Sequence, residues 1–402
     1  MMTAFNEWSG LWAAAFPALL CLYVMIGASV HVLRREARPE APVLLEDLPS
    51  VAVLVPARNE AKVLEECLLA LLDSDHPGLE IHVLSDGSTD GTADIARRYE
   101  SRGVRLHEHP VNVGKSQVLE QALSGLTSEL VMVIDADTHL GRPAARVMAE
   151  VFARDPGVAG ATANVRVKQA GNLLARLQVV EYASIIGLLK RANSAWGGLF
   201  TVSGAACCFR TEIVRTAGGF ASPSITEDIE LSWRLQKSGH RLVYVPQALV
   251  GVEVPHTLRD LWQQRVRWSQ GLAEVLRVHG DVRRSRNPAL AVFAGEALLG
   301  MFWAVLLVWH LPAGVAGWMG SGGPARWTPG FWQGLGMALF FCQTAMAMLY
   351  DGHYTRLPWR YLPLALVYPC YFLVLILPTS LLGWIRGIFS SNSGRWERSS
   401  RS

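Results

Sequence analysis

The chain has 402 residues, of which half are hydrophobic and 18% are charged, and its formal net charge is +3. So small a positive charge argues against a nucleic-acid-binding protein, and we expect no nucleic-acid partner. The hydrophobic residues gather in long runs near both ends of the chain. This distribution is typical of a membrane protein whose large polar middle lies outside the bilayer.

The first hydrophobic run covers residues 11–33, and Arg34 and Arg35 follow it directly. It is long enough to cross a hydrocarbon layer of roughly 30 Å. A cleaved signal peptide is the alternative, but its basic residues precede the hydrophobic run, whereas here they follow it. Because basic residues favour the cytoplasmic side, we expect residues 1–10 outside and the polar middle in the cytoplasm.

The segment 50–280 has the pattern of an α/β domain. Three short hydrophobic stretches, each typical of a strand, end in "PARNE", "SDGSTDGT" and "DADTHL", and a helical pattern follows each of them. Strands that alternate with helices predict a mainly parallel sheet covered on both faces. Ligands of such sheets bind at the carboxyl ends of the strands, so we expect the three polar clusters to converge on one site.

Asp135 and Asp137 close the third of these strands. Side chains two residues apart in an extended segment point the same way, so the two carboxylates can share one divalent cation. Oxygen-only ligands favour Mg²⁺ or Mn²⁺, which usually also bind substrate phosphates. Two solvated turn aspartates are the alternative, and the position at a strand end favours the metal site.

Two further polar positions follow the same pattern. Asp86 is placed to accept hydrogen bonds from a base edge, although its segment also fits a simple helix cap. Lys115, at the start of another predicted helix, is either a phosphate or nucleotide contact or an ordinary surface lysine. The paired cysteines Cys207 and Cys208 lie in the same polar domain, where we expect buried thiols rather than a disulfide.

The stretch "SITEDIELSWRL" predicts a helix with Thr226 as its cap and Glu227 and Asp228 in its first turn. A capping motif is one interpretation. In the other, one of the two carboxylates is a general base that removes a proton from an attacking hydroxyl.

The stretch "LRDLWQQRVRWSQGLAEVL", residues 258–276, predicts a helix just before the next hydrophobic run. Arginines at lipid headgroups and tryptophans at the membrane boundary are typical of an interfacial helix. We expect this anchoring role for Arg259, Trp262 and Arg265.

Three more hydrophobic runs cover residues 288–310, 327–350 and 361–385, and a basic tail covers 386–402. Three simple crossings would place the C-terminus outside, whereas the basic tail favours the cytoplasm. One run is therefore expected to lie in the interface or to re-enter. The prolines of the last run make it the strongest candidate.

In this order and spacing, "PARNE", "SDGSTDGT", "DAD", "TED" and "QRVRW" resemble the family 2 inverting glycosyltransferases, which include the membrane-embedded synthases of cellulose, chitin and hyaluronan. The sequence is most similar to bacterial poly-β-1,6-N-acetylglucosamine synthases. That likeness rests on "NLLARLQVVEYASIIGLLKR", "FTVSGAACCFR" and "ITEDIELSWRLQKSGHRLVYVPQALV". It covers residues 51–278 almost continuously.

The resemblance implies a nucleotide-sugar-binding domain of the GT-A type, flanked by transmembrane helices. It also implies a role for each matching residue. The uridine would lie near Asp86, Glu60 and Lys115, and the diphosphate and its metal near Asp135 and Asp137. Asp228 would be the catalytic base, with Glu227 at the substrate. Gln264 and Arg267 would contact the diphosphate, and Trp268 the acceptor. The donor sugar and the acceptor entrance would be lined by Asn164, Lys168, Ser203 and Gly204.

The sequence departs from the family at two places. Many members have paired aspartates after the second strand, whereas only Asp86 is present here, and the N-terminal side shows one span where such synthases often have two.

The implied partners are a UDP-sugar, with UDP-N-acetylglucosamine favoured, a growing glycan, the bilayer and a small accessory membrane subunit. The implied location is a bacterial inner membrane. Three alternatives stay open: a transferase that adds one sugar to a lipid, a cellulose- or hyaluronan-like synthase, and a transporter or scaffold, for which Glu296 inside a span is the argument.

Overall fold

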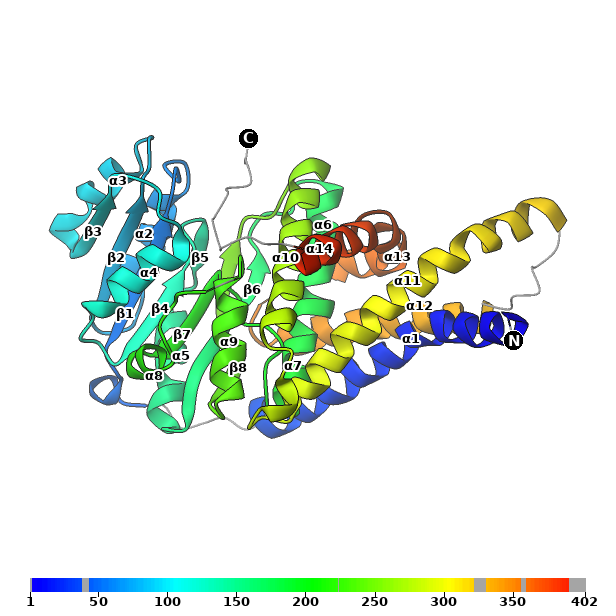
Figure 1. Ribbon diagram of the computed structural model, residues 1–402. Helices are drawn as coiled ribbons and strands as arrows, with labels where there is room; N and C mark the ends of the chain where they lie inside the picture. Colours follow the sequence, from blue (N-terminus) through cyan, green and yellow to red (C-terminus); the bar gives the residue numbers. More distant parts are fainter. Residues whose placement is uncertain (1, 38–42, 223, 322–329, 356–358, 390–402) are drawn as a thin grey trace.

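The computed structural model describes residues 2–37, 43–222, 224–321, 330–355 and 359–389. Figure 1 shows an α/β domain at one end of the molecule and long helices at the other, with the N-terminus at the far end of these helices. Most of the expected basic tail over 386–402 lies outside the described residues, as do positions 327–329 of the third expected span and position 1.

The described strands form one eight-stranded sheet in the order β3-β2-β1-β4-β7-β6-β8-β5. The strands are β1 (Val51–Ala57), β2 (Leu79–Asp86), β3 (Val104–His109), β4 (Leu130–Ile134), β5 (Thr138–Leu140), β6 (Val158–Val167), β7 (Ala206–Arg210) and β8 (Arg241–Val252). Strand β1 pairs in parallel with β2 and β4, β2 with β3, and β6 with β8, whereas β7 and β5 run antiparallel to their neighbours. The predicted mainly parallel sheet is confirmed.

The helices of the α/β domain are α2 (Leu64–Leu72), α3 (Thr92–Arg98), α4 (Lys115–Ser124), α5 (Ala144–Arg154), α6 (Leu173–Glu181), α7 (Leu188–Ala195), α8 (Thr211–Thr216), α9 (Glu227–Lys237) and α10 (Leu258–Val278). Short 3₁₀ or π turns are η2 (Leu45–Asp47), η3 (Glu100–Arg102), η4 (Tyr182–Gly187) and η5 (Val282–Arg284). The π turn η4 joins α6 to α7 without a break in the helical path.

The sheet has a hydrophobic core on each face. In β1, Val51, Val53 and Val55 belong to one core cluster, and Ala52 and Leu54 to the other, because successive side chains of a strand point to opposite faces. Helices α2 and α5 contribute to the first cluster, and α4 and α9 to the second. A central strand that is buried on both faces must be apolar throughout, which explains the continuous "VAVLV" run. Cys207 and Cys208 are buried free thiols, as predicted.

The remaining helices are α1 (Met2–His31) with the π turn η1 (Val32–Glu36), α11 (Ala289–Ser321), α12 (Gly330–Asp351), the 3₁₀ helix η6 (Trp359–Leu366), α13 (Tyr368–Tyr371), the π turn η7 (Phe372–Ile376) and α14 (Leu377–Phe389). In the described part of the chain, three helical segments are long and apolar enough to cross a membrane: Trp8–Glu36, Ala289–His310 and Tyr368–Phe389. The expected span over 327–350 is not among them, and its described part lies in α12, which packs on α1.

The last hydrophobic run is divided between η6 and α13, and its expected re-entry stays a prediction. Pro363 lies in η6, and Pro369 lies in the first turn of α13. From α13 onward the chain is helical, and α14 packs along α10, as Figure 1 shows. The C-terminal segment is therefore in direct contact with the helix that carries the "QRVRW" stretch.

A buried network of charges joins the long helices to the α/β domain. The Arg191 guanidinium of α7 lies 2.8 Å from a Glu36 carboxylate oxygen at the end of η1 and 2.9 Å from an Asp351 oxygen at the end of α12. Asp351 also pairs with Arg166 of β6, and the Tyr354 hydroxyl donates to Glu36 over 2.8 Å. Arg191 and Asp351 are fully buried.

Candidate active site

A cavity of about 360 Å³ lies where the carboxyl ends of β4, β6 and β8 meet α9 and α10. It brings together most of the residues that the sequence predicts. Those in its wall are Lys115, Asp135, Asp137, Ser203, Gly204, Glu227, Asp228, Gln264, Arg267 and Trp268. The third strand-end cluster, with Asp135 and Asp137, therefore meets Lys115 and the start of α9 in one cavity, whereas no residue of "PARNE" or "SDGSTDGT" lies in the wall.

Lys115 is the electrostatic centre of the cavity. Its ammonium lies 2.8 Å from a carboxylate oxygen of Asp135 and 2.8 Å from one of Glu227, and its side chain is largely buried. Burial alone would lower the pKa of Lys115, but the carboxylates of Asp135, Glu227 and Asp228 raise it overall. The lysine therefore carries a full positive charge at neutral pH.

Asp86 holds the loop that presents Lys115. Its buried carboxylate accepts hydrogen bonds from the backbone N–H of Val113 (2.7 Å) and of Gly114 (2.9 Å). Gly87, the next residue, has a φ of +61°, and a Cβ there would lie 2.4 Å from the Asn112 nitrogen. A glycine is thus required for this close approach of two loops. Asp86 is outside the cavity wall, and its predicted contact with a base stays a prediction.

Asp228 lies in the first turn of α9 and is partly buried. Burial, together with the neighbouring Glu227 carboxylate, raises its pKa to about 6. The backbone of Gly204 passes so close that a Cβ there would lie 2.8 Å from the Asp228 Oδ2 atom. A carboxylate with a raised pKa in a cavity has the properties of a general base.

Thr226 precedes Asp228 at the start of α9, but it does not cap the helix with its side chain. Its hydroxyl instead lies 3.1 Å from the Ser224 hydroxyl. The methyl and hydroxyl of Thr226 pack against Gly271 of α10, where a Cβ would lie 2.3 Å away. Thr226 thus occupies the predicted N-cap position, but its side chain makes no capping bond and instead forms a contact between α9 and α10.

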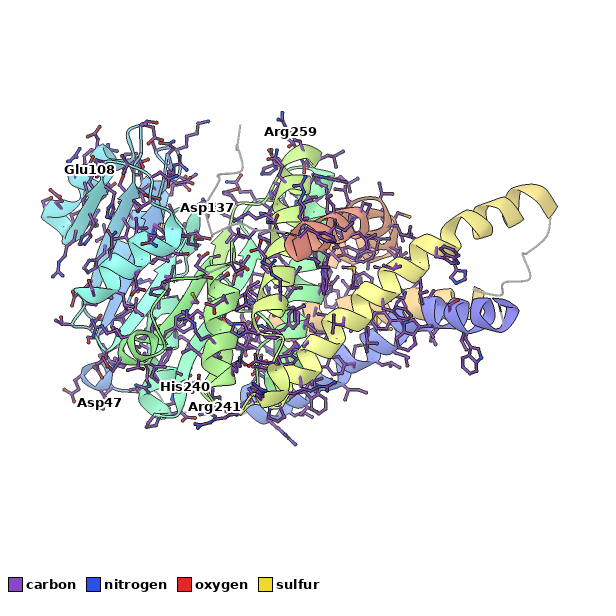
Figure 2. All side chains as sticks on the ribbon, in the orientation of Figure 1. Asp47, Glu108, Asp137, His240, Arg241 and Arg259 are labelled. Atoms are coloured by element: carbon purple, nitrogen blue, oxygen red, sulfur yellow. The ribbon has the colours of Figure 1, made fainter. Side chains whose placement is uncertain are left out.

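Helix α10 places Gln264, Arg267 and Trp268 on the cavity. Figure 2 shows Arg259 at the outer end of this helix, where it is exposed, as expected of an anchoring residue. The expectation for Arg265 is wrong, because this arginine is only 6% exposed.

The Arg265 guanidinium lies 2.9 Å from a carboxylate oxygen of Glu181 and 4.4 Å from the ring centre of Trp268. Glu181 also accepts a hydrogen bond from the Tyr371 hydroxyl over 3.2 Å. Arg265 therefore belongs to the site and not to the interface.

Four predicted residues lie outside the cavity wall: Glu60, Asp86, Asn164 and Lys168. Glu60 follows β1, and its backbone N–H donates to the Thr92 hydroxyl over 2.8 Å. Lys168 pairs with Glu66 and with Glu253, which does line the cavity.

The expectation that Asn164 lines the donor or acceptor entrance is wrong. Its side chain is fully buried beside a bulge of β8, and its amide donates to the Pro246 carbonyl of that bulge over 2.9 Å. It stabilises the sheet at the bulge.

Asp135 and Asp137 supply two carboxylates at the end of β4. Among the described residues, no three His, Cys, Asp or Glu side chains group as metal ligands. Mg²⁺ and Mn²⁺ are usually held through one or two carboxylates together with substrate phosphates, so this pair fits such an ion.

Sequence reasoning missed three cavity residues on one helical face. Tyr182, Ile186 and Lys190 lie four residues apart along η4 and α7, and all three line the cavity. The available signal was the spacing itself, because i, i+4 and i+8 share one side of a helix. A lysine that continues an otherwise apolar stripe indicates a buried charge.

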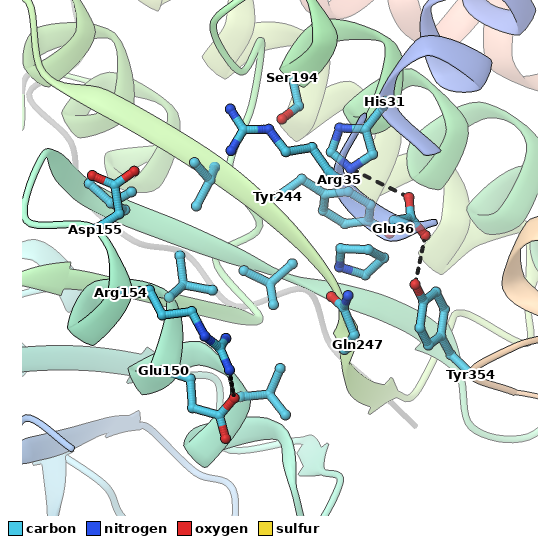
Figure 3. A pocket seen from close by; sticks show the side chains of 16 residues that line it. His31, Arg35, Glu36, Glu150, Arg154, Asp155, Ser194, Tyr244, Gln247 and Tyr354 are labelled. Atoms are coloured by element: carbon cyan, nitrogen blue, oxygen red, sulfur yellow. Dashed lines mark hydrogen bonds and ion pairs between the residues drawn. The ribbon is translucent and has the colours of Figure 1, made fainter. Parts of the chain in front are cut away.

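A second cavity, of about 520 Å³, lies at the amino-terminal ends of β6 and β8 (Figure 3). Its wall contains none of the predicted site residues. Figure 3 shows Arg154 bonded to Glu150 on one side and Glu36 bonded to Tyr354 on the other. Since α/β sheets bind ligands at the carboxyl ends of their strands, the cavity that contains Asp228 is the better candidate.

Comparisons with known proteins identify the family of the chain. The family profile described as "Glycosyltransferase like family 2" matches residues 49–271. A poly-β-1,6-N-acetyl-D-glucosamine synthase of Staphylococcus epidermidis is 30% identical over 303 residues, which are 74% of this chain and 73% of that protein. The synthase of Staphylococcus aureus (strain COL) is 31% identical over 305 residues, with the same coverage.

The fold also has a solved counterpart. The mannosyltransferase PcManGT from Pyrobaculum calidifontis, in complex with GDP-Man and Mn²⁺, is similar with a TM-score of 0.63. The similarity covers 94% of this chain and 100% of that one, at 21% sequence identity. At this identity the comparison shows a common GT-A fold.

Proposed function

The chain belongs to glycosyltransferase family 2 and is a glycosyltransferase, and from this premise we propose that it is a membrane-embedded polysaccharide synthase. Its proposed donor is UDP-N-acetylglucosamine and its proposed product poly-β-1,6-N-acetylglucosamine. The names of the staphylococcal relatives support the product. The observation that carries the proposal is the single cavity in which the Asp228 carboxylate, the Lys115 ammonium and the Trp268 indole meet.

In the proposed reaction, a hydroxyl of the growing glycan attacks the anomeric carbon of the donor while the bond to UDP breaks. Asp228 takes the proton of that hydroxyl as general base. One displacement converts an α-linked donor into a β-linked product. Lys115 and Arg267 stabilise the negative charge that gathers on the departing diphosphate.

The other predicted residues take subsidiary roles in this proposal. Asp135 and Asp137 hold Mg²⁺ or Mn²⁺, which when bound supplies positive charge to the diphosphate. The remaining proposed contacts are with the uridine (Asp86, Glu60), the substrate (Glu227), the diphosphate (Gln264), the acceptor (Trp268) and the donor sugar or entrance (Lys168, Ser203, Gly204).

The proposed setting is a bacterial inner membrane, with the domain of residues 50–280 in the cytoplasm. The three apolar helical segments support attachment to a membrane. The contact of α14 with α10 brings one of them to the catalytic helix, where a product chain can pass outward. A small accessory membrane subunit remains part of the proposal.

Transfer of one sugar to a lipid is the second candidate. An apolar cavity of about 470 Å³ between α1, α11, α12 and residues 368–373 favours it, because such a cavity suits an acyl or isoprenoid chain. The size of the product separates the two candidates.

The test is a panel of UDP-sugars offered to purified membranes, with sizing and linkage analysis of the product. We expect a β-1,6-linked polymer from UDP-N-acetylglucosamine. Asp228→Asn should lower transfer by about 10²- to 10⁴-fold and leave UDP binding intact. The exposed Asp94→Asn is the matched control. Exclusive use of UDP-glucose would overturn the proposed substrate.

A further inference from the structure

Lys190 is a buried lysine of the cavity wall for which the reaction above has no role. Its side chain comes from α7, and only 6% of the residue is exposed. Its ammonium has one hydrogen bond, to the Thr162 hydroxyl over 3.3 Å, and lies 5.9 Å from the ring centre of Tyr244. Within the described chain, no carboxylate lies at ion-pair distance from it.

Such an environment is unfavourable for an ammonium group. A lysine offers three donors, and one long bond to a neutral hydroxyl leaves two of them unsatisfied. Lys115, in the same cavity, is also largely buried but has two carboxylates at 2.8 Å. Because buried charges are normally paired, the open donors of Lys190 indicate a ligand that completes them.

The surroundings of Lys190 indicate on which side of Asp228 this ligand lies. The charge of Asp228 acts on both buried lysines, but Asp135 and Glu227 act appreciably only on Lys115. The ion pairs show the same division, because Asp135 and Glu227 pair with Lys115 and neither of them pairs with Lys190.

Hydrogen bonds also link Lys190 to the backbone beside Asp228, the candidate base. The Thr162 hydroxyl that bonds Lys190 also accepts the backbone N–H of Ser203 over 3.0 Å, and Gly204 follows against Asp228. Tyr182 and Ile186, on the same helical face as Lys190, complete this part of the wall together with Trp268.

We propose that Lys190 is an acceptor-binding residue, whose ammonium donates hydrogen bonds to hydroxyl groups of the terminal sugar of the glycan beside Asp228. A sugar supplies several neutral oxygens close together, which suits an ammonium with more than one open donor. This assignment rests on the proposed glycan synthesis. It adds a cation to the acceptor side of the site, which otherwise offers the Trp268 ring.

The test replaces Lys190 by methionine, which has a similar length and no donors. We expect transfer to the glycan acceptor to fall roughly ten- to hundredfold, as for the loss of a charged hydrogen bond. The dissociation constant of UDP-N-acetylglucosamine should stay within about twofold, since the donor is bound by other residues. The thermal midpoint should stay unchanged or rise, because a poorly paired buried charge is removed.

Lys237→Met is the matched control, since Lys237 pairs with Asp281 at the surface, and it should change none of these quantities. A lower thermal midpoint for Lys190→Met would show a structural role. A donor dissociation constant that rises by the same factor as transfer falls would place the lysine on the donor. Either result overturns the assignment, as does full transfer by the variant.

The pH dependence of transfer gives an independent readout. Burial lowers the pKa of Lys190 to about 8, and the Asp228 carboxylate partly offsets this effect. Arg166 of β6 lowers the pKa further, whereas Cys207 of β7 raises it. The ring of Tyr244 of β8 also faces the ammonium. Since the protonated form donates, transfer should fall as pH rises through about 8. In Lys190→Arg this loss should move to higher pH.

Failure of the proposed synthesis and failure of the proposed role of Lys190 give different results. Wild-type membranes that turn over no UDP-sugar would overturn both the synthesis and the acceptor role. Normal wild-type synthesis, with an alkaline loss that is identical in Lys190→Arg, would overturn only the role of Lys190.

Discussion

In the wall of the cavity, the guanidinium of Arg265 contacts both an indole ring and a carboxylate. One face of it lies 4.4 Å from the Trp268 ring centre, and one of its nitrogens lies 2.9 Å from Glu181. A cation over an indole face is attractive, and the ion pair fixes the plane of the cation. Arg265 therefore holds the ring of Trp268 in one orientation toward the cavity, and we regard it as a positioning residue.

Arg265→Lys tests this role at the level of one residue. Lysine keeps the charge opposite Glu181 but has no planar group to stack on the indole, so the thermal midpoint should change little. Transfer should fall about three- to tenfold, and the effect should largely disappear in a Trp268→Leu background, because coupled residues are not additive. Initial rates of the four proteins of this cycle measure the coupling.

Arg259→Lys, on the exposed end of the same helix, is the control and should leave the rate unchanged. If the effects of Arg265→Lys and Trp268→Leu on transfer simply multiply, the two side chains act independently and the positioning role is wrong.

At the scale of elements, α10 is held between two close contacts. On one side, a Cβ on Gly383 of α14 would lie 2.6 Å from the Val266 carbonyl oxygen, and one on Gly387 would lie 2.5 Å from that of Gln270. On the other side, Gly271 of α10 lies against Thr226, two residues before Asp228. Glycines four residues apart let two helix backbones approach closely. The C-terminal helix thus sets the position of α10, and through it that of α9.

Gly387→Leu should separate α14 from α10. The added side chain has no space at the Gln270 carbonyl or at the Ala273 side chain, so the helices must move apart. We expect a loss of about 1–3 kcal/mol in unfolding free energy and a fall in transfer. Thermal unfolding in detergent and initial rates measure the two effects.

Ile388→Leu changes an exposed neighbour on the same helix and should be neutral in both measurements. Full activity of a Gly387→Leu protein with a lowered thermal midpoint would mean that α14 supports stability but not the site.

The same elements show what could be predicted from sequence. Asp135, Asp137 and Asp228 could be placed in one site, because strand ends and helix starts are local features and parallel strands end at one edge. Lys190 and Arg265 could not, since their burial depends on how α7 and α10 pack against distant segments. Asn164 was misplaced for a related reason, because it lies beside a bulge of β8 that arises only when β8 pairs with β6.

At the scale of the whole molecule, a group of extended apolar helices must stay attached to a polar domain. The Arg191 guanidinium of α7 meets the end of η1 through Glu36 and the end of α12 through Asp351. Arg166 of β6 shares Asp351, so the sheet takes part in the same network. These buried charges join four parts of the chain that are distant in sequence. The mutual pairing of these charges fixes the α/β domain to the long helices. Apolar contacts with lipid alone would leave the helices free to shift relative to the domain.

Arg191→Met should weaken this attachment. Removal of the arginine leaves the Glu36 and Asp351 carboxylates without their shared cation, and loss of one partner of a buried ion pair costs about 3–5 kcal/mol. We therefore expect a lower thermal midpoint and faster proteolysis between the helices and residues 50–280.

The exposed Arg283→Met should alter neither measurement, although it removes the same charge. A variant as stable as the wild type would show that apolar packing of α1 on α7 is sufficient to hold the domain. Reduced transfer should accompany the lower midpoint, because Lys190 is adjacent to Arg191 on α7 and moves with it.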